Sequence, residues 1–397
     1  MKRIFMVLIL AILSVSALFA ASYTIDESDT INLSGISKII FNIKKPNCAL
    51  CISTGKQTYS FTGGGSRNEI KLLLEGNISS NHKKAVPRLI TDSTGGTVTV
   101  TLYENPSLFF GLVQSGSVYF QAELPSDFAG DVEIVTSSGD SVVENLSAER
   151  LSIRSSSGDI DAADLSADNL EIKASSGDIS AVRLSSMQEL YIHASSGGIT
   201  IDEASAADSI IDSSSGRINI GMITASQTLL IEASSGKISA DKVKGLTVEV
   251  ESHSGRINIG NLLAETARIK SSSGKITINQ LDTDTADISS SSGGLEIGSG
   301  SGSIRYDGSS GDTDITLSAL NGDLDIENSS GDVTLSLPEN SAFSANMRAS
   351  SGRIRSDFQL LGDVSDNKKN IVVGEANGGG NSIRIKASSG NIDITER

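Results

Sequence analysis

A Ser-Ser-Gly turn that recurs at a nearly constant spacing constrains the fold of this chain more than any other feature of its sequence. Neighbouring turn glycines lie 18 to 21 residues apart, and the one longer interval of 38 residues is twice 19. A fixed period of this length is typical of solenoids, in which every repeat forms one coil that stacks on the next. The turn glycines are Gly139, Gly158, Gly177, Gly197, Gly216, Gly236, Gly255, Gly274, Gly293, Gly311, Gly331, Gly352 and Gly390.

Within one repeat the apolar residues alternate with polar ones. Between Gly158 and Gly177, the segments 159–162 and 169–174 each place an apolar residue at every second position. This period predicts two short β-strands per coil, each with one face toward the interior. The sequence therefore predicts an all-β, single-chain parallel β-solenoid with about 19 to 20 residues per coil. Because parallel crossovers are right-handed, we expect right-handed coiling.

The residues of the turn have distinct expected roles. We expect the glycine to supply a positive φ angle at the corner, where a residue with a Cβ atom would be strained. The serines before it are small enough to stack at a corner, and their hydroxyl groups can bond to the backbone of the same or the next coil.

The N-terminal 21 residues have the pattern of a secretory signal peptide. Lys2 and Arg3 precede an apolar run that extends to Phe19, and the small residues Ala20 and Ala21 follow. An uncleaved anchor is the alternative, although the run is slightly short for a full span. We therefore expect an exported protein that is extracellular, at the cell surface or periplasmic, with no transmembrane span after signal removal.

Beyond the signal peptide, the sequence predicts two regions. Residues 22–130 hold most of the aromatic residues and only faint repeats, which predicts an N-terminal β cap with degenerate coils. A ligand-binding head made from these aromatics is the alternative. Residues 131–397 form the regular solenoid, with a loop excursion at 357–381 before a last coil at 383–394.

The residue after each turn glycine changes its charge along the chain. It is acidic in the early and late repeats, and four successive repeats carry Arg217, Lys237, Arg256 and Lys275. A calcium-binding roll needs acidic ligands on successive coils, so we expect no metal site there. These four residues predict a basic ridge, which is either a solvated edge or a surface for an anionic glycan. The net charge of −16 disfavours nucleic acid as a partner.

Cys48 and Cys51 are the two cysteines of the chain. In an exported protein they suggest a disulfide, but residues three apart in an extended strand lie too far apart to bridge without a turn. The sequence leaves this disulfide open. Two thiols without a histidine or carboxylate cluster beside them do not make a metal site.

Several runs resemble a known family. Leu337-Pro338 is followed by the run 349–358, a glycine-rich loop and the run 383–392, and Leu124-Pro125 precedes an early Ser-Ser-Gly-Asp turn. These runs are similar to the bacterial "putative adhesin" family of β-strand repeats, a domain of unknown function. The resemblance implies a surface or envelope location and adhesion. It supplies no catalytic, metal or cofactor-binding residues.

The most direct functional hypothesis is an exported, non-enzymatic repeat protein that presents a long surface to a protein or glycan partner, as an adhesin or envelope interaction protein. A structural or sensing component inside the envelope is the alternative. A polysaccharide lyase or hydrolase on a β-helix is a third hypothesis, since Asp159, Asp161 and Asp178 could supply paired carboxylates. Acidic residues recur on every exposed face, however, and the three histidines are isolated in the sequence, so we expect no catalytic site and no cofactor.

Overall fold

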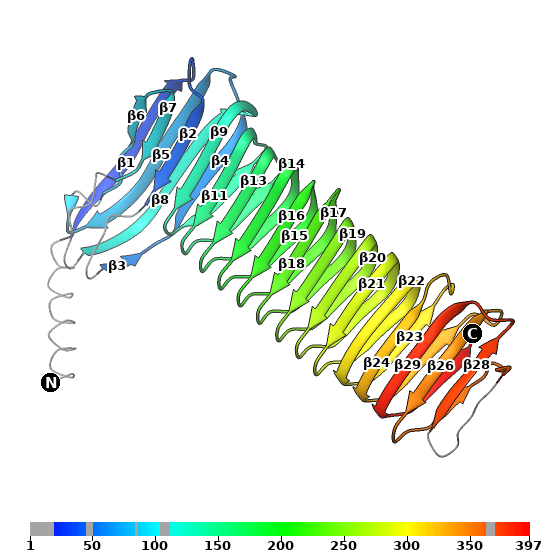
Figure 1. Ribbon diagram of the computed structural model, residues 1–397. Coiled ribbons are helices and arrows are strands. Elements are labelled where there is room, and N and C mark those ends of the chain that lie inside the picture. The colour runs from blue at the N-terminus through cyan, green and yellow to red at the C-terminus, as the bar shows by residue number, and fades with distance from the viewer. Residues whose placement is uncertain (1–19, 45–50, 84–85, 104–111, 363–369) are drawn as a thin grey trace, which may run out of the picture. The chain divides into compact units, whose positions relative to one another are not determined.

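The computed structural model describes residues 20–44, 51–83, 86–103, 112–362 and 370–397, with the side chains of 51–54 and 112–114 left aside. Within these ranges the chain is all-β, with thirty strands and no helix (Figure 1). The strands coil into a β-solenoid of about 11 turns with about 19 residues per turn, as the turn spacing predicts. Two compact units divide the chain, one up to Met187 and one from Gln188.

In the first unit, regular coils are formed by strands that pair in parallel with the strand one repeat later. β9 pairs with β11 and β11 with β13, so that Val132, Leu151 and Leu170 lie in register and are buried. The strands are β1 (Ala21–Asn32), β2 (Lys38–Ile43), β3 (Cys51–Thr54), β4 (Gln57–Gly65), β5 (Glu69–Ser80), β6 (Ile90–Thr94), β7 (Thr97–Thr101), β8 (Leu112–Pro125), β9 (Asp127–Thr136), β10 (Asp140–Glu144), β11 (Ser147–Ser155), β12 (Ile160–Ala163), β13 (Leu165–Ala174) and β14 (Ile179–Ala194), whose last residues belong to the second unit.

The N-terminal part of this unit mixes parallel and antiparallel pairs. β2 lies between β7 and β9, and β4 lies between β8 and β10, so the coil 38–65 is inserted between two coils that follow it in the chain. β1, β5 and β8 are antiparallel, as are β6 and β7. Phe41, Phe61 and Phe120 fill the interior with ring centroids 5.0 to 6.2 Å apart.

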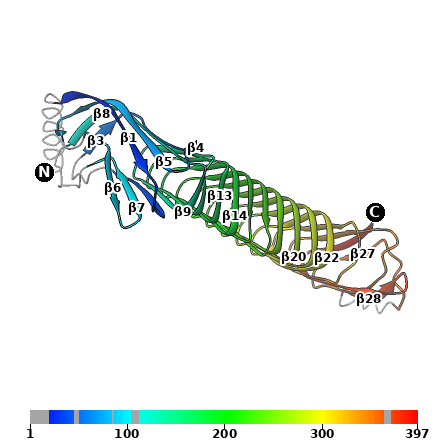
Figure 2. The same cartoon turned by 90° about the horizontal axis from the view of Figure 1, so that it is seen from above.

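In the second unit, the stacked strands run in register over many coils (Figures 1 and 2). Ile257 pairs with Ile276, and Ile269 with Ile288; all four side chains are buried. The strands are β15 (Ile199–Ala206), β16 (Asp208–Ser213), β17 (Ile218–Ala225), β18 (Thr228–Ala233), β19 (Ile238–Ser252), β20 (Ile257–Ser271), β21 (Ile276–Ser290), β22 (Leu295–Ser310), β23 (Thr313–Leu317), β24 (Leu324–Ser330), β25 (Val333–Leu337), β26 (Phe343–Ala349), β27 (Ile354–Ser356), β28 (Ile371–Ala376), β29 (Asn381–Ser389) and β30 (Ile392–Glu396).

The expectation that 383–394 forms the last coil is wrong for the spatial order. β29 lies between β24 and β26, and β30 lies between β25 and β27, so the final coil of the chain is inserted below the coil 343–356. β28 adds to β26 in antiparallel orientation, and Phe343 contacts Phe358 edge to face at 5.2 Å. The spacing of the turns cannot reveal this insertion, because the inserted coil has the same turn and the same alternation as the coils on either side of it.

The expected reason for the turn glycines is also wrong at most positions. Gly139, Gly311 and Gly331 have positive φ angles, but Gly158 and Gly236 do not. A Cβ atom on Gly236 would lie 1.7 Å from the carbonyl oxygen of the turn glycine one coil earlier, and one on Gly158 would lie 1.9 Å from its counterpart. The glycine is therefore required by the close stacking of one turn on the next.

Serines close several of these turns from within. Ser271 is 1% exposed, accepts a hydrogen bond from the Gly274 N–H at 2.9 Å and donates one to the Gly274 carbonyl at 2.8 Å. Ser252 accepts from the Gly255 N–H at 3.0 Å. The expected bonding of turn hydroxyls to the backbone is thus confirmed, and it comes from the buried residue three positions before the glycine.

Other expectations stay predictions. Residues 1–19 of the predicted signal peptide and Cys48 lie outside the described residues, so neither cleavage nor the bond between Cys48 and Cys51 is tested. The boundaries of the cap and the handedness of the coils also stay predictions. No helix in the described ranges is long and apolar enough to cross a membrane.

Candidate functional site

The structure places the predicted basic ridge, Arg217, Lys237, Arg256 and Lys275, on four consecutive coils. The Arg217 carbonyl accepts a hydrogen bond from the Ile199 N–H at 2.8 Å, and the carbonyls of the other three accept from the N–H groups that follow the preceding turn, at 3.0 to 3.1 Å. Successive positions are therefore about 4.8 Å apart. Arg217, Arg256 and Lys275 are exposed and Lys237 is half-buried, so the four cations form a continuous row at the surface.

In several coils where the residue after the turn glycine is an aspartate, its side chain bonds to the backbone of a neighbouring coil. The Asp159 carboxylate accepts a hydrogen bond from the Asp178 N–H at 2.8 Å, and the Asp312 carboxylate accepts one from the Asp332 N–H at 3.0 Å. Asp332 in turn accepts from the Asn391 N–H at 2.8 Å. An aspartate in this column therefore caps the backbone of the next coil. Lysine and arginine have no acceptor atom, so the basic ridge lacks this bond.

Neutral polar residues flank the basic ridge on the strands that follow it. The next outward residues are Asn219, Ser239, Asn258 and Thr277, which pair in register. Lys237 Nζ lies 3.0 Å from the amide oxygen of Asn258 when that amide is oriented to accept. At the end of the row, Lys275 pairs with Glu296 at 2.6 Å, with both side chains about half exposed.

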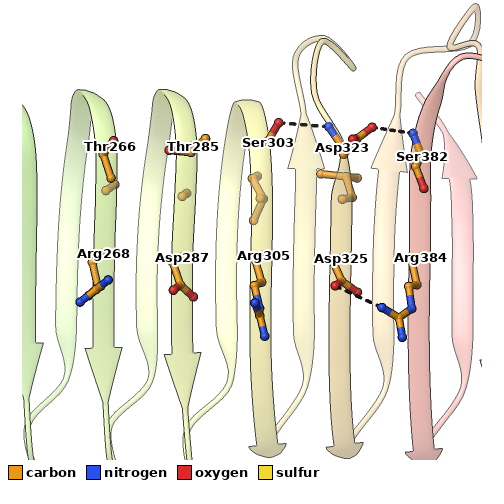
Figure 3. Close-up of a pocket in the computed structure, with 14 residues that line it drawn as sticks. Thr266, Arg268, Thr285, Asp287, Ser303, Arg305, Asp323, Asp325, Ser382 and Arg384 are labelled. Atoms are coloured by element: carbon orange, nitrogen blue, oxygen red, sulfur yellow. Dashed lines mark hydrogen bonds and ion pairs between the residues drawn. The ribbon is translucent and has the colours of Figure 1, made fainter.

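A second feature of this unit is a shallow groove of about 440 Å³, shown in Figure 3. It lies on the part of each coil that precedes the turn, whereas the basic ridge follows the turn. The groove and the coil before it carry residues of alternating charge on successive coils, and we call this row the charge ladder. The register of β19, β20, β21, β22, β24 and β29 defines this row. Its members are Glu249, Arg268, Asp287, Arg305, Asp325 and Arg384.

Ion pairs fix the two ends of this face more than its middle. Arg384 lies 3.5 Å from Asp325 and 3.7 Å from Glu327. The hydrogen bond from Lys386 lowers the pKa of Glu327, and the bond to Glu251 raises the pKa of Lys270. One carboxylate oxygen of Asp325 is buried without a hydrogen-bond partner. The ladder is thus not fully satisfied within the described part of one chain.

His193 has neighbours that the sequence does not show. Its Nδ1 contacts the Asp212 carboxylate, and its Nε2 lies 3.2 Å from the Ser195 hydroxyl. Tyr191 stacks on the imidazole, with ring centroids 6.3 Å apart. Asp212 lies one coil later in the same column as His193, so the imidazole links two coils. The spacing of 19 residues between His193 and Asp212, one repeat, is the signal that could have found this pair.

The remaining candidates show no metal chemistry. Within the described ranges there is no group of three or more histidine, cysteine, aspartate or glutamate side chains that could hold a metal ion. A second shallow groove of about 480 Å³ contains Leu246 and Leu263, each 45% exposed. Asp159 and Asp161 lie on one coil of the first unit, where burial and the nearby carboxylates of Asp159 and Asp140 raise the pKa of Asp161.

Comparisons with known proteins find similar solved structures and one family. A putative cell adhesion protein from Clostridium sporogenes is 10% identical with a TM-score of 0.22, over 94% of this chain and 100% of its own. A putative adhesin from Parabacteroides distasonis is 12% identical with a TM-score of 0.32, over 69% of this chain and 97% of its own. No curated protein matches the chain. The toastrack DUF4097 family matches residues 65–244 and 224–395, and the chain therefore belongs to this family.

Proposed function

We propose that the protein is an exported, non-enzymatic, adhesin-like binding protein whose basic ridge contacts a linear anionic polysaccharide of a cell surface. One observation supports this proposal above the others. In the column after the turn glycine, aspartates cap the next coil, whereas Arg217, Lys237, Arg256 and Lys275 replace that cap with four adjacent cations. The fold does not need these cations, so a role outside the fold accounts for them.

The spacing of the basic ridge suits a polymer. Four cations about 4.8 Å apart lie within roughly two Debye lengths at physiological salt, so an extended polyanion can contact all of them at once. Each exposed contact contributes little alone, and a polymer gains from the sum of several. The neutral amides and hydroxyls of Asn219, Ser239 and Thr277 next to the row can bond to sugar hydroxyls without repelling an anion.

Binding is tested with the purified protein and a soluble polyuronate, with a neutral polysaccharide of similar length for comparison. The double variant Lys237→Glu/Arg256→Glu reverses two central cations and should lower the affinity for the polyuronate at least about tenfold, or about 1.4 kcal/mol. Arg150→Glu/Arg348→Glu is the matched control, because both arginines are exposed and lie outside the ridge. Equal losses in both double variants would show that only net charge matters and would contradict the proposal.

Location needs its own experiment. Protease or antibody access to the protein on intact cells, compared with permeabilised cells, separates surface display from an envelope interior. Labelling of intact cells supports an adhesin-like role. Protection until permeabilisation would contradict it and favour the structural or sensing alternative.

A hydrolase is the second candidate, and the contacts of His193 with Asp212 and Ser195 are the observation that favours it. A hydroxyl, an imidazole and a carboxylate in this order are the groups of a hydrolytic triad. Because the imidazole also links two coils, we assign it a structural role. A fluorophosphonate probe should leave Ser195 unlabelled. Labelling that is lost in His193→Ala would overturn the non-enzymatic assignment.

A further inference from the structure

The charge ladder has a property that goes beyond the proposed function, because it is complementary to itself. Its six members alternate strictly between negative and positive, starting with Glu249 and ending with Arg384. Arg268, Asp287 and Arg305 are exposed on the open face of the groove (Figure 3). An alternating row with an even number of members matches its own reverse, charge against opposite charge.

Two symmetric arrangements could bring this face against the same face of a second copy. A two-fold axis parallel to the stacking direction places every coil opposite itself, and therefore every charge opposite a like charge. A two-fold axis along the strands, between Asp287 and Arg305, reverses the coil order instead. Glu249 then faces Arg384, Arg268 faces Asp325, and Asp287 faces Arg305. Only the second arrangement is electrostatically favourable.

The two columns of residues that flank the charge ladder are also electrostatically compatible with the reversed arrangement. In the reversed arrangement each column faces itself in reverse order, and in neither column does a charge meet a like charge. Glu251 meets Lys386 and Lys270 meets Glu327, while Asp323 and Asp307 meet hydroxyl groups. The facing members of the hydroxyl-rich column are Thr247 with Ser382, Thr266 with Asp323, and Thr285 with Ser303. The facing members of the other column are Glu251 with Lys386, Lys270 with Glu327, and Ser289 with Asp307.

We propose that a second copy of this chain docks on the charge ladder in the reversed, antiparallel arrangement and forms a reversible two-fold dimer. Asp287 and Arg305 lie at its centre, beside the axis, and each pairs with the other across the interface. In each coil the turn separates the basic ridge from the charge ladder, so the basic ridges of both copies stay accessible to a polyanion. Such a dimer would bind a polyanion at two sites at once.

The size of the face sets the expected strength. Six coils about 4.8 Å apart and five residues of about 3.3 Å each give roughly 480 Å² per copy, or roughly 960 Å² in total. This area lies at the lower limit of specific interfaces, and its contacts are charged and accessible to solvent. We therefore expect an association of micromolar strength that weakens as salt is added.

Sedimentation equilibrium of the full chain over a range of concentrations tests this dimer. Wild type should be dimeric at low salt and monomeric at high salt. Arg305→Asp and Asp287→Arg should each weaken the dimer at least about tenfold, because each puts like charges together twice at the axis. The double variant Asp287→Arg/Arg305→Asp should restore dimerisation. Arg150→Asp changes the net charge by the same amount as Arg305→Asp, lies outside this face and should leave the dimer unchanged.

The double variant also separates this proposal from a role of the ladder inside one chain. Within one chain the exchange places a positive charge next to Arg268 and a negative charge next to Asp325, so the intrachain alternation is not restored. Pairing across the two-fold axis is restored, because the two exchanged positions still face each other with opposite charges. A wild type that stays monomeric at every concentration and salt would overturn the proposal. So would a folded double variant that remains monomeric while wild type dimerises.

Failure of this dimer can be told apart from failure of the proposed function. Polysaccharide binding is measured at concentrations where the chain is monomeric, so the basic ridge is assayed without any contribution from the charge ladder. Loss of binding in Lys237→Glu/Arg256→Glu therefore reports on the ridge alone, whatever the oligomeric state at higher concentration.

Discussion

Replacing one turn glycine by alanine tests the stacking of the coils most directly. Gly236 lies in the middle of the regular repeats, and its backbone does not have a positive φ. The new Cβ atom would lie 1.7 Å from the Gly216 carbonyl oxygen and 2.6 Å from its carbon. Real Cβ atoms do not approach closer than 3.0 Å, so the two turns must separate by more than about 1 Å.

The cost of this separation follows from the bonds beside it. Ser235 donates its N–H to the Ser214 carbonyl at 3.2 Å, and Ile218 donates to the Lys237 carbonyl at 3.0 Å. Moving the turns apart by more than about 1 Å lengthens both bonds beyond hydrogen-bonding distance. Each loss costs about 1 to 3 kcal/mol where the group is left without a partner, so the two losses together cost about 2 to 6 kcal/mol, and the packing strain adds to this. This is a large part of the stability of a typical domain.

Thermal and urea unfolding of Gly236→Ala measure this cost, with two controls. Ser235→Ala changes an exposed residue of the same turn and should change stability by less than about 0.5 kcal/mol. Gly378→Ala meets no atom within 4 Å but has a φ of +89°, so it should cost about 1 to 2 kcal/mol through backbone strain alone. If Gly236→Ala were as mild as Ser235→Ala, close stacking would not explain the repeated glycine.

Three further outcomes follow from the structure. Deleting residues 381–397 removes the inserted coil, so hydrogen exchange should accelerate in the coil 343–356 while the coils before residue 290 stay protected; uniform loss of protection would contradict this. Asp161→Asn should raise stability to urea at neutral pH and leave it unchanged well below pH 3.8. Burial and the neighbouring carboxylates raise the pKa of the Asp161 carboxyl above its ordinary value. The folded state therefore favours the protonated carboxyl, and the stability that this form contributes is present below the ordinary pKa and is lost as the pH rises through the raised pKa. Lys237→Asp should keep or raise the thermal midpoint, because its carboxylate can cap the next coil, and should weaken polyuronate binding; a large loss of stability would refute the capping role.

The repeat reveals the coil in the sequence but not its ends. Alternation around Ile257 and Ile269 predicts two short inward-facing strands per coil. The structure buries both residues as predicted, but it places them on one continuous strand, β20. The insertion of 381–396 below 343–356 depends on pairing between segments that share the same pattern, so periodicity alone cannot order them. Most turn glycines were predicted at the right positions for the wrong reason, because a single repeat does not show how closely its turn stacks on the turn one coil earlier.

In the column of the basic ridge, the residues that favour stability differ from the residues that favour binding of an anionic partner. Every coil offers the same backbone N–H beside the residue after the turn glycine, and Asp159 or Asp312 satisfies it in the acidic coils. A chain selected only for stability would keep that carboxylate, since a bond from a backbone N–H to a carboxylate is among the stronger hydrogen bonds. Lys237 and its neighbours in the column give up the bond in four successive coils and place four like charges about 4.8 Å apart. Both changes oppose stability, and both favour an anionic partner.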